Sequence, residues 1–282
     1  MNDEVKKILI EINQFCNLNC KYCFYNDSGR AKEFINNNYI KKLLKKYKNC
    51  EEFFLTGGEC LLNIDFEKIV STISKTRKVI LFTNGILFNK YDNKKLNKIV
   101  NQISSFVITF DTFNEEYKLR IGKESLVADS IKKLVNIDPD KVVVKICLSK
   151  MNIFDFEDTI KGLLDLGVKH LSLNYIKNIS SCNINFELTD EEIIKSFEII
   201  KKYKKYFNKK NIEFIMKSYL NNFKNKVKCI AGDKFIFIDT FGNEYYCPCL
   251  GKKLDNKKNN KCFGKHCVCV WEMFNERIWI QF

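Results

Sequence analysis

The chain contains few of the residues that usually mark linkers and export signals. Its 282 residues include 2 prolines and 11 glycines, so few junctions between domains are evident. The apolar run after MNDEVKK is too short for a signal peptide, and no run is long enough to span a membrane. We therefore expect a cytoplasmic protein, with one large α/β domain or a domain of roughly 200 residues plus a small appendage.

Arginine is scarce, although the net charge is +14. A strongly basic chain can bind nucleic acid or another acidic partner. The lysines, however, are scattered along probable helix faces, as in KKLLKKYKN (41–49) and KKYKKYFNKKN (201–211). We therefore disfavour nucleic acid as a partner, while an acidic peptide partner stays open. The arginines are Arg30, Arg77, Arg120 and Arg277.

Cysteine, in contrast, is abundant. Thirteen cysteines are too many for a reducing compartment unless several of them bind metal. Three lie within residues 16–23 and six within 229–269, which predicts two metal sites. We expect the isolated cysteines to be buried and inert by default. These are Cys50, Cys60, Cys147 and Cys182.

Short β-rich runs alternate with helical patterns from residue 6 to about residue 207. Mostly apolar strands that alternate with helices predict an α/β fold with a parallel sheet covered by helices. Catalytic residues in such folds lie on loops that leave the C-terminal ends of the strands. The expected strands are 6–12, 52–56, 78–83, 105–110, 141–148 and 170–176. The expected helices are 38–47, about 65–75, 92–101, 125–136, 155–166 and 189–207.

The pattern changes after about residue 210. KFIFIDTFGNEYYC (234–247) reads as a β-hairpin with Gly242-Asn243 in the turn. We predict a core domain over residues 1–210 and a small Cys-rich domain over residues 211–282.

The motif CNLNCKYC directly follows the first expected strand and holds Cys16, Cys20 and Cys23. A structural zinc site usually has four close ligands, and both histidines, His170 and His266, are distant in sequence. Three thiolates instead suit a four-iron cluster in which one iron has no protein ligand.

The spacing C-x3-C-x2-C after a first strand, with Tyr22 before the last cysteine, resembles the radical S-adenosylmethionine (radical SAM) enzymes. The resemblance implies a partial (β/α)6 TIM-like barrel and a [4Fe–4S] cluster held by the three cysteines. It also implies that SAM binds the fourth iron and is cleaved to a 5′-deoxyadenosyl radical, which abstracts a substrate hydrogen. An electron donor such as flavodoxin or ferredoxin is then expected.

LTGGEC (55–60) matches the family's Gly-Gly-Glu loop, which holds the amino group of SAM. Gly57 and Gly58 let the backbone approach a ligand closely, and Glu59 can pair with an ammonium group. Cys60 replaces the family's usual proline, which places the loop geometry in question.

FTNGIL (82–87) permits two interpretations. Asn-Gly between apolar runs is a strong hairpin signal. The family often carries Thr-Asn-Gly at the end of its third strand, which makes Thr83 and Asn84 candidate cofactor-binding residues. We favour the family role.

Further candidates follow the fourth and fifth strands. The resemblance implies that Asp111 contacts the substrate or a ribose and that Arg120 contacts the SAM carboxylate. The alternative is a helix-start aspartate and a surface arginine. Ser149 and Asn152, after the fifth strand, are candidates by position, with Ser149 assigned to cofactor binding.

The second thiol group begins as C-x12-G-x4-C, with Gly242 between Cys229 and Cys247. This resembles the SPASM/twitch extension, which implies one auxiliary [4Fe–4S] cluster. A second auxiliary cluster and a zinc ribbon stay open as alternatives. The expected ligands are Cys229 and Cys247 with two of the last four cysteines, of which we choose Cys262 and Cys267, with Cys269 as the next candidate and Cys249 also nearby.

The SPASM/twitch resemblance points to enzymes that modify ribosomally made peptides, by epimerisation or crosslinking. Some family epimerases return a hydrogen atom from a cysteine, and Cys182 is our candidate donor, with a plain loop residue as the alternative. A separate protein could supply peptide recognition, because the cluster loop begins too early for an N-terminal recognition domain. The runner-up is oxidation of a sugar or cyclitol. A non-catalytic iron–sulfur electron carrier or a zinc-binding module is the alternative from another class, and neither needs a Gly-Gly-Glu loop.

Overall fold

The computed structural model describes residues 4–23, 25, 30–117, 119–120, 123–176, 178, 183–208, 212, 231–246 and 248. The strands are β1 (Lys7–Glu11), β2 (Glu52–Thr56), β3 (Lys78–Thr83), β4 (Ser105–Phe110), β5 (Val142–Leu148), β6 (His170–Tyr175), β7 (Phe235–Ile238) and β8 (Glu244–Tyr245). The α-helices are α2 (Asn37–Lys46), α3 (Phe66–Ile73), α4 (Asn93–Gln102), α5 (Glu124–Ile137), α6 (Phe156–Asp165) and α7 (Asp190–Lys202). Short 3-10 helices are η1 (Cys60–Leu62), η2 (Ile86–Lys90), η3 (Glu115–Tyr117), η4 (Pro139–Lys141), η5 (Ile153–Asp155) and η6 (Lys204–Tyr206).

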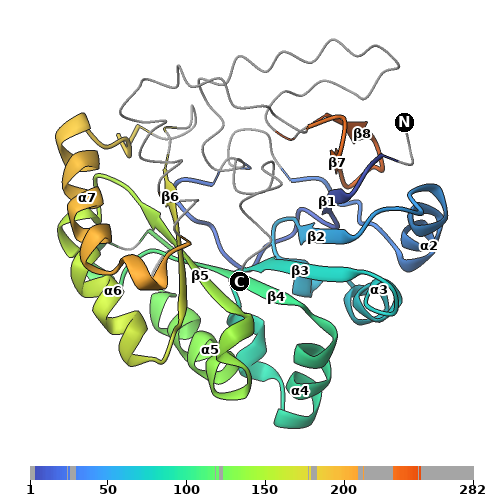
Figure 1. Ribbon diagram of the computed structural model, residues 1–282, viewed down its shortest axis with the longest axis horizontal. Coiled ribbons are helices and arrows are strands. Elements are labelled where there is room, and N and C mark those ends of the chain that lie inside the picture. Colours follow the sequence, from blue (N-terminus) through green and yellow to red (C-terminus); the bar gives the residue numbers. More distant parts are fainter. Residues whose placement is uncertain are drawn as a thin grey trace.

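These strands form one sheet in the order β6-β5-β4-β3-β2-β1-β7-β8. Neighbours from β6 to β7 pair in parallel, and β8 pairs antiparallel with β7. The sheet curves into an open barrel wall, and the helices cover its outer side (Figure 1). This confirms the predicted α/β class and the partial TIM-like barrel.

Helix ends follow local capping and packing. The α2 helix begins where the Asn36 side chain accepts a hydrogen bond from the Tyr39 N–H. A capping box of Thr189 and Glu192 begins α7. We predicted that this last helix reaches residue 207, but it ends at Lys202. Phe207 makes a bridge to β6 and is buried, so packing against the sheet draws the chain out of the helix.

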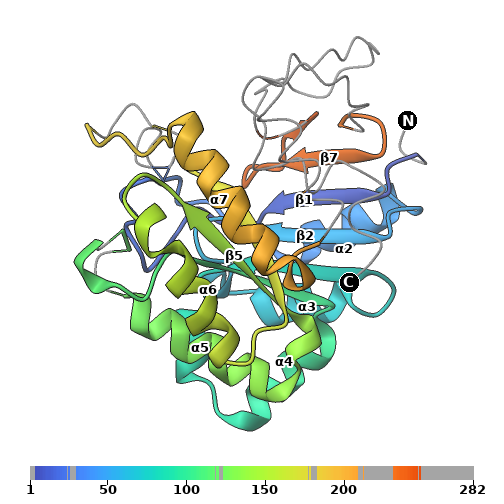
Figure 2. The ribbon, with the colours of Figure 1, turned by 60° about the vertical axis from the view of Figure 1, so that its left-hand side comes forward.

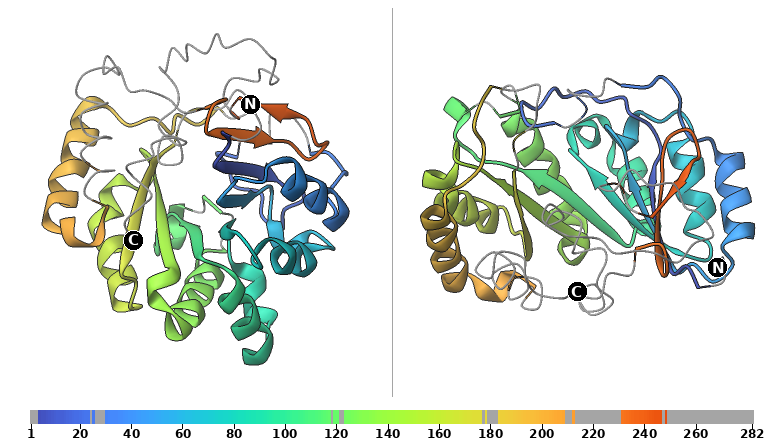
Figure 3. Two further views of the ribbon diagram at one scale, coloured as in Figure 1. Left: turned by 45° about the vertical axis from the view of Figure 1, so that its right-hand side comes forward. Right: turned by 90° about the horizontal axis from the view of Figure 1, so that it is seen from above.

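The predicted hairpin is confirmed as β7 and β8, with Gly242 in its turn at φ 82°. Such a positive φ favours glycine. Figures 2 and 3 show that β7 lies beside β1 and extends the same sheet. The domain boundary near residue 210 stays a prediction.

The main hydrophobic core lies between the outer face of the sheet and the helices. Ile8 and Ile10 of β1 enter it together with Leu43 of α2 and Ile69 of α3. Among the described residues, no helix is both long and apolar enough to cross a membrane. The core fixes the strands, and the strands fix the loops at their C-terminal ends.

Candidate functional site

Cys16, Cys20 and Cys23 lie in the loop that follows β1, at the C-terminal edge of the sheet. All three are outside any disulfide and partly exposed. The Leu18 N–H donates to Cys16 Sγ at 3.4 Å, and the Cys23 N–H donates to Cys20 O at 3.0 Å. In the part of the chain that the structure describes, no three Cys, His, Asp or Glu side chains are gathered as a ready-made metal site.

The loop after β2 packs directly on this cysteine loop. The Gly58 N–H donates to Asn13 O at 2.9 Å, and the Glu59 N–H donates to Phe15 O at 2.6 Å. A Cβ atom at Gly57 would lie 2.2 Å from Asn13 O, and one at Gly58 would lie 2.2 Å from Phe15 O. The glycines therefore permit close approach to the cysteine loop, where our sequence argument invoked approach to a ligand.

The Glu59 carboxylate lies within the protein and is fully buried. It accepts hydrogen bonds from Thr83 Oγ1 at 2.7 Å, from the Asn84 N–H at 2.8 Å and from the Leu61 N–H at 3.1 Å. Burial raises the pKa of Glu59, and these hydrogen bonds oppose that rise. Glu59 thus joins the loop after β2 to the loop after β3. Its predicted contact with a SAM amino group stays a prediction.

Asn84 continues this network to the cysteines. Its Nδ2 donates to Asn17 Oδ1 at 2.9 Å and lies 3.7 Å from Cys16 Sγ. The hairpin interpretation of Asn84-Gly85 is wrong, because β3 and β4 run parallel and Gly85 begins η2 at φ 77°. The cofactor roles of Thr83 and Asn84 stay predictions.

Tyr22, which is partly buried, bonds to the fully buried pair of Asp111 and Arg120. Arg120 Nε lies 3.0 Å from Asp111 Oδ2, and Arg120 Nη2 lies 3.2 Å from Asp111 Oδ1. The Tyr22 hydroxyl donates to the Asp111 carboxylate at 2.8 Å and accepts from Arg120 Nη2 at 3.0 Å. Burial raises the pKa of Asp111, and the Arg120 charge opposes that rise. The structure thus joins two residues that the sequence assigned to different ligands, and those ligand roles stay predictions.

The loop after β5 joins the same region through Asn152. Asn152 Oδ1 accepts from the Ser149 N–H at 2.8 Å and from Ser149 Oγ at 3.0 Å. Asn152 Nδ2 donates to Asp111 O at 2.8 Å and to Cys147 O at 3.0 Å. Both side chains are buried, so Ser149 shapes the turn, and its assignment to cofactor binding stays a prediction.

Sequence reasoning missed three residues of the site. Asn13 is fully buried and donates from Nδ2 to Glu59 O at 3.1 Å, and Asn17 accepts from Asn84. Glu124 Oε1 accepts from the Arg120 N–H at 3.1 Å. The available signal for Asn13 and Asn17 was their place beside Cys16, at the end of a strand.

The remaining cysteines divide into two groups. Cys50, Cys60 and Cys147 are buried, as predicted. Burial raises the pKa of Cys50 and of Cys147 to about 12, which suits inert thiols. Outside the described residues lie Cys182, Cys229, Cys247, Cys249, Cys262, Cys267 and Cys269.

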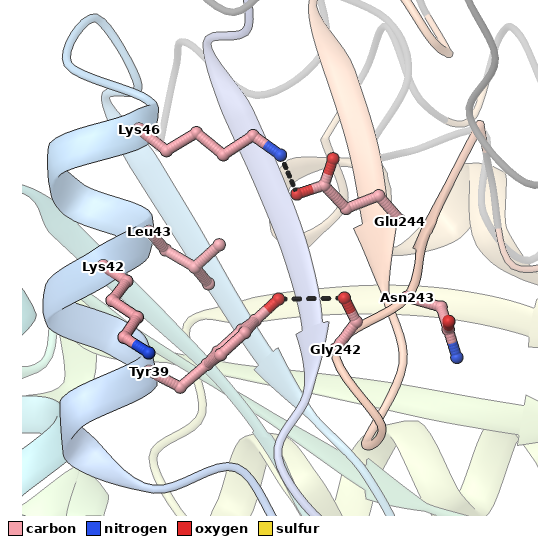
Figure 4. Close-up of a pocket in the computed structure, with 7 residues that line it drawn as sticks. All are labelled: Tyr39, Lys42, Leu43, Lys46, Gly242, Asn243 and Glu244. Carbon is pink, nitrogen blue, oxygen red and sulfur yellow. Dashed lines mark hydrogen bonds and ion pairs between the residues drawn. The ribbon is translucent and has the colours of Figure 1, made fainter.

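A groove of about 440 Å³ lies between α2 and the β7–β8 hairpin (Figure 4). Tyr39 Oη donates to Gly242 O at 2.9 Å across it, and Lys46 pairs with Glu244. None of the predicted cofactor ligands lines this groove. The two contacts across the groove hold the hairpin against α2.

The family is decided by a match over more than half of the chain. The model of the radical SAM superfamily matches residues 10–163, which include the cysteine loop and the strands that carry the buried network. This chain belongs to the radical SAM superfamily. The match confirms the family that the sequence motifs indicated.

A probable GTP 3′,8-cyclase of Methanococcus aeolicus is 26% identical over 257 residues, which cover 87% of this chain and 80% of the relative. Among solved structures, Streptococcus suis SuiB bound to S-adenosylmethionine has a TM-score of 0.66 at 14% identity, covering 98% of this chain and 67% of SuiB. SuiB is also solved bound to precursor peptide SuiA. The anSMEcpe structure with AdoMet and the Cp18Cys peptide has a TM-score of 0.64 at 17% identity, covering 86% of this chain and 73% of anSMEcpe. At these identities the structural neighbours establish the fold alone.

Proposed function

We propose that this radical SAM enzyme abstracts a hydrogen atom from a ribosomally synthesised peptide, leading to epimerisation or crosslinking. The observation that carries the radical chemistry is the convergence of strand-end loops on the three cysteines. Glu59 binds the loop that contains Asn84, and Asn84 lies against Cys16. The cysteines of the C-terminal segment would hold an auxiliary [4Fe–4S] cluster of the SPASM/twitch type.

The three thiols of the loop after β1 fit a four-iron cluster held by Cys16, Cys20 and Cys23. Their thiols form no disulfide and are partly exposed, and the Leu18 backbone N–H and the Asn84 side-chain N–H donate to Cys16 Sγ. Hydrogen bonds to cluster sulfurs are a known means of tuning reduction potential. When bound, the cluster and SAM supply one-electron cleavage of SAM and a 5′-deoxyadenosyl radical that abstracts a substrate hydrogen.

The chain's own residues orient the cysteine loop at both of its ends. Asn84 and Asn17 hold the Cys16 end through a hydrogen bond at 2.9 Å. Tyr22 holds the other end, because its hydroxyl bonds the buried Asp111–Arg120 pair. These side-chain contacts are partly buried, and lower local polarity strengthens them. A loop fixed in this way suits a cofactor that must be held in one orientation.

A peptide substrate is supported by two structural neighbours that were solved with peptides, SuiB with SuiA and anSMEcpe with Cp18Cys. A second candidate is a nucleotide substrate, which the likeness to a probable GTP 3′,8-cyclase over 87% of the chain supports. Oxidation of a sugar or cyclitol is a third outcome that the experiment below can detect. A pure electron carrier is disfavoured, because the radical SAM family model matches residues 10–163 of the chain.

The first experiment is anaerobic reconstitution of the full chain, followed by iron and sulfide counting and detection of 5′-deoxyadenosine after adding SAM and dithionite. We expect 5′-deoxyadenosine and about eight irons per chain, because two four-iron clusters are proposed. About four irons with 5′-deoxyadenosine would refute the auxiliary cluster alone. An iron-loaded protein that forms no 5′-deoxyadenosine, with or without GTP or a precursor peptide, would refute the radical function.

Two sets of variants locate the chemistry. Replacing Cys16, Cys20 and Cys23 together with alanine should abolish 5′-deoxyadenosine formation while the C-terminal iron stays bound, and Cys50→Ala is the matched control. Glu59→Ala should weaken SAM binding while the iron is retained. Unchanged SAM affinity in Glu59→Ala would count against the predicted role of this loop.

Substrate class is tested by adding GTP or a precursor peptide encoded beside the gene. Peptide modification predicts a mass change or a stereochemical change in the peptide, with stimulated 5′-deoxyadenosine formation. Stimulation by GTP alone would replace the peptide assignment with the nucleotide one. Stimulation by a sugar or cyclitol alone would favour the dehydrogenase.

A further inference from the structure

Glu11 is a buried carboxylate at the C-terminal end of β1, just before the cysteine loop. Alternate residues of a strand face opposite sides of the sheet, so Glu11 lies on the same side as Leu9. Leu9 belongs to a small apolar cluster with Phe54 and Phe235, apart from the main core under the helices. The Glu11 side chain therefore lies on the inner side of the curved sheet, next to the loop that carries the three cysteines.

Three uncharged donors meet this carboxylate. Tyr25 Oη donates to Glu11 Oε1, and Gln14 Nε2 donates to Glu11 Oε2 at 2.9 Å. The Thr240 N–H donates to the same Oε2 at 3.3 Å. Burial raises the pKa of Glu11, and the bonds from Gln14 and Thr240 oppose that rise. A buried carboxylate is costly unless hydrogen bonds satisfy it, so these donors stabilise Glu11 in its place.

Two of the three donors flank the cysteine motif. Gln14 lies two residues before Cys16, and Tyr25 lies two residues after Cys23. Gln14 Oε1 also accepts from the Ala31 N–H at 2.6 Å, which ties the chain beyond the motif to the same point. The chain thus enters and leaves the cysteine motif beside one carboxylate.

The third donor belongs to the β7–β8 hairpin. Thr240 lies in the connection between the two strands and is buried. Its Oγ1 donates to Glu33 O at 3.0 Å, in the segment between the cysteine loop and α2. The hairpin leads directly to Cys247, a predicted ligand of the auxiliary cluster. Glu11 therefore bonds both to the cysteine loop and to the hairpin that precedes the second group of thiols.

Two roles are open to a carboxylate at this place, contact with a ligand and positioning of the loop. A carboxylate has about four lone-pair sites, and three donors already point at Glu11. Its side chain is 4% exposed, which leaves little surface for a ligand. The geometry therefore favours positioning.

We propose that Glu11 is a positioning residue that holds the cysteine loop by both of its flanks and couples this loop to the β7–β8 hairpin. The inference rests on the proposed function, because it concerns the orientation of the cysteines that would hold the cluster. Glu11 acts through Gln14 and Tyr25 and contacts neither SAM nor substrate. Loss of its bonds should therefore alter the surroundings of the iron and also loosen the hairpin.

The test compares Glu11→Met with Glu11→Gln in the anaerobically reconstituted full chain. Methionine has a similar length but lacks the oxygens that accept these bonds. Glutamine is the conservative variant, because its oxygen can accept from Gln14 and Thr240 while its amide donates to the Tyr25 hydroxyl. Rescue by glutamine would therefore show that the bonds matter.

Glu52→Met is the matched control. Glu52 lies at the N-terminal end of β2, where its carboxylate pairs with Lys7 at 3.3 Å. Its loss removes a carboxylate from the same sheet at the edge opposite the cysteine loop. This variant therefore reports the effect of a general loss of stability.

The first readout is the change that SAM produces in the electron paramagnetic resonance spectrum of the dithionite-reduced protein, measured together with SAM affinity. Glu11→Met should show a diminished change and bind SAM about tenfold more weakly, because loss of the flank bonds displaces the loop. Glu11→Gln and Glu52→Met should resemble wild type. If Glu11→Met does not fold, Tyr25→Phe removes one flank bond while the carboxylate stays, and its SAM affinity should also fall.

The second readout is hydrogen exchange in a peptide covering residues 235–246, followed by mass spectrometry. Exchange in Glu11→Met should be about tenfold faster than in wild type, as expected for the loss of one hydrogen bond of roughly 1.4 kcal/mol. Exchange in Glu11→Gln should stay near the wild-type rate. This readout needs no SAM cleavage, so it reports on the coupling by itself.

Wild-type SAM affinity in a folded Glu11→Met would overturn the positioning role, and unchanged hairpin exchange would overturn the coupling. Equal effects of Glu11→Met and Glu52→Met on both readouts would also overturn the proposal, since general destabilisation would then explain them. Formation of 5′-deoxyadenosine by wild type is measured separately. Its failure would refute the radical function, whereas hairpin exchange would still report on Glu11.

Discussion

Asp111 and Arg120 form a buried ion pair in which both oxygens of the carboxylate meet the guanidinium group at 3.0 and 3.2 Å. The Tyr22 hydroxyl bonds to both partners. Tyr22 lies between Cys20 and Cys23 in the chain, so this pair fixes the cysteine loop to the end of β4. Removal of one partner from such a pair leaves a buried charge without compensation.

Tyr22→Phe should test this attachment. The change removes one hydroxyl from the buried pair and should lower the free energy of unfolding by about 1–3 kcal/mol. Tyr39→Phe removes a hydroxyl that bonds Gly242 and not the cysteine loop, so it should leave iron binding by Cys16, Cys20 and Cys23 intact. Urea unfolding and iron content of both variants provide the measurement. Equal iron retention and stability in both would show that Tyr22 does not hold the loop.

Gly58→Ala should disturb the cysteine loop through its backbone. The added Cβ would lie 2.2 Å from Phe15 O, and a backbone atom cannot rotate away. We expect a loss of about 2 kcal/mol or more in stability, with reduced iron binding. Gly162→Ala is the control, because its Cβ would meet the Phe113 ring, which can turn. Iron content after reconstitution separates the two variants, and normal iron in Gly58→Ala would contradict the close packing.

The buried thiols should resist alkylation. Burial raises the pKa of Cys50 and of Cys147 to about 12, so at pH 8 roughly one thiol in ten thousand is ionised, and the thiolate is the reactive form. Iodoacetamide labelling of the native protein at pH 8, mapped by peptide mass spectrometry, should leave both residues unlabelled until urea is added. Rapid native labelling of either residue would indicate that the strand or loop around it opens readily.

Gly242→Ala should weaken the attachment of the hairpin to α2. The glycine has a φ of 82°, and a Cβ there would lie 3.0 Å from the Tyr39 ring. The positive φ alone should cost about 1–2 kcal/mol, with a further loss from the ring contact. Gly85→Ala has a similar φ of 77° but 3.4 Å of clearance to the Ser130 side chain, so it isolates the conformational cost. Thermal unfolding of both variants should show the larger shift for Gly242→Ala.

Strand positions were predictable because the apolar runs are short, continuous and bounded by polar residues. EFFLT at 52–56, KVILFT at 78–83 and SFVITF at 105–110 coincide with β2, β3 and β4. The end of α7 was not predictable, because the helical pattern continues past Lys202 and only the contact of Phe207 with β6 ends it. Long-range packing overrode a local pattern there.

The site was predictable only where its signal is local. The three cysteines and the Gly-Gly-Glu loop are short motifs, each contained in one strand-end segment. Asn13 and Asn17 escaped notice because asparagine is common throughout this chain, and their place beside Cys16 does not by itself tell a buried asparagine from an exposed loop residue. Their importance follows from the burial of Asn13 and from partners that lie far away in sequence, Glu59 for Asn13 and Asn84 for Asn17.

The sequence by itself determined the family, the parallel α/β sheet and the loop that carries the three cysteines, because each depends on spacing within a few residues. Only the tertiary structure decided that Asp111 pairs with Arg120, that Glu59 organises neighbouring loops and that Glu11 bonds both flanks of the cysteine motif. These relationships depend on strand register and burial. Both are set by the packing of the whole core, so no short segment encodes them.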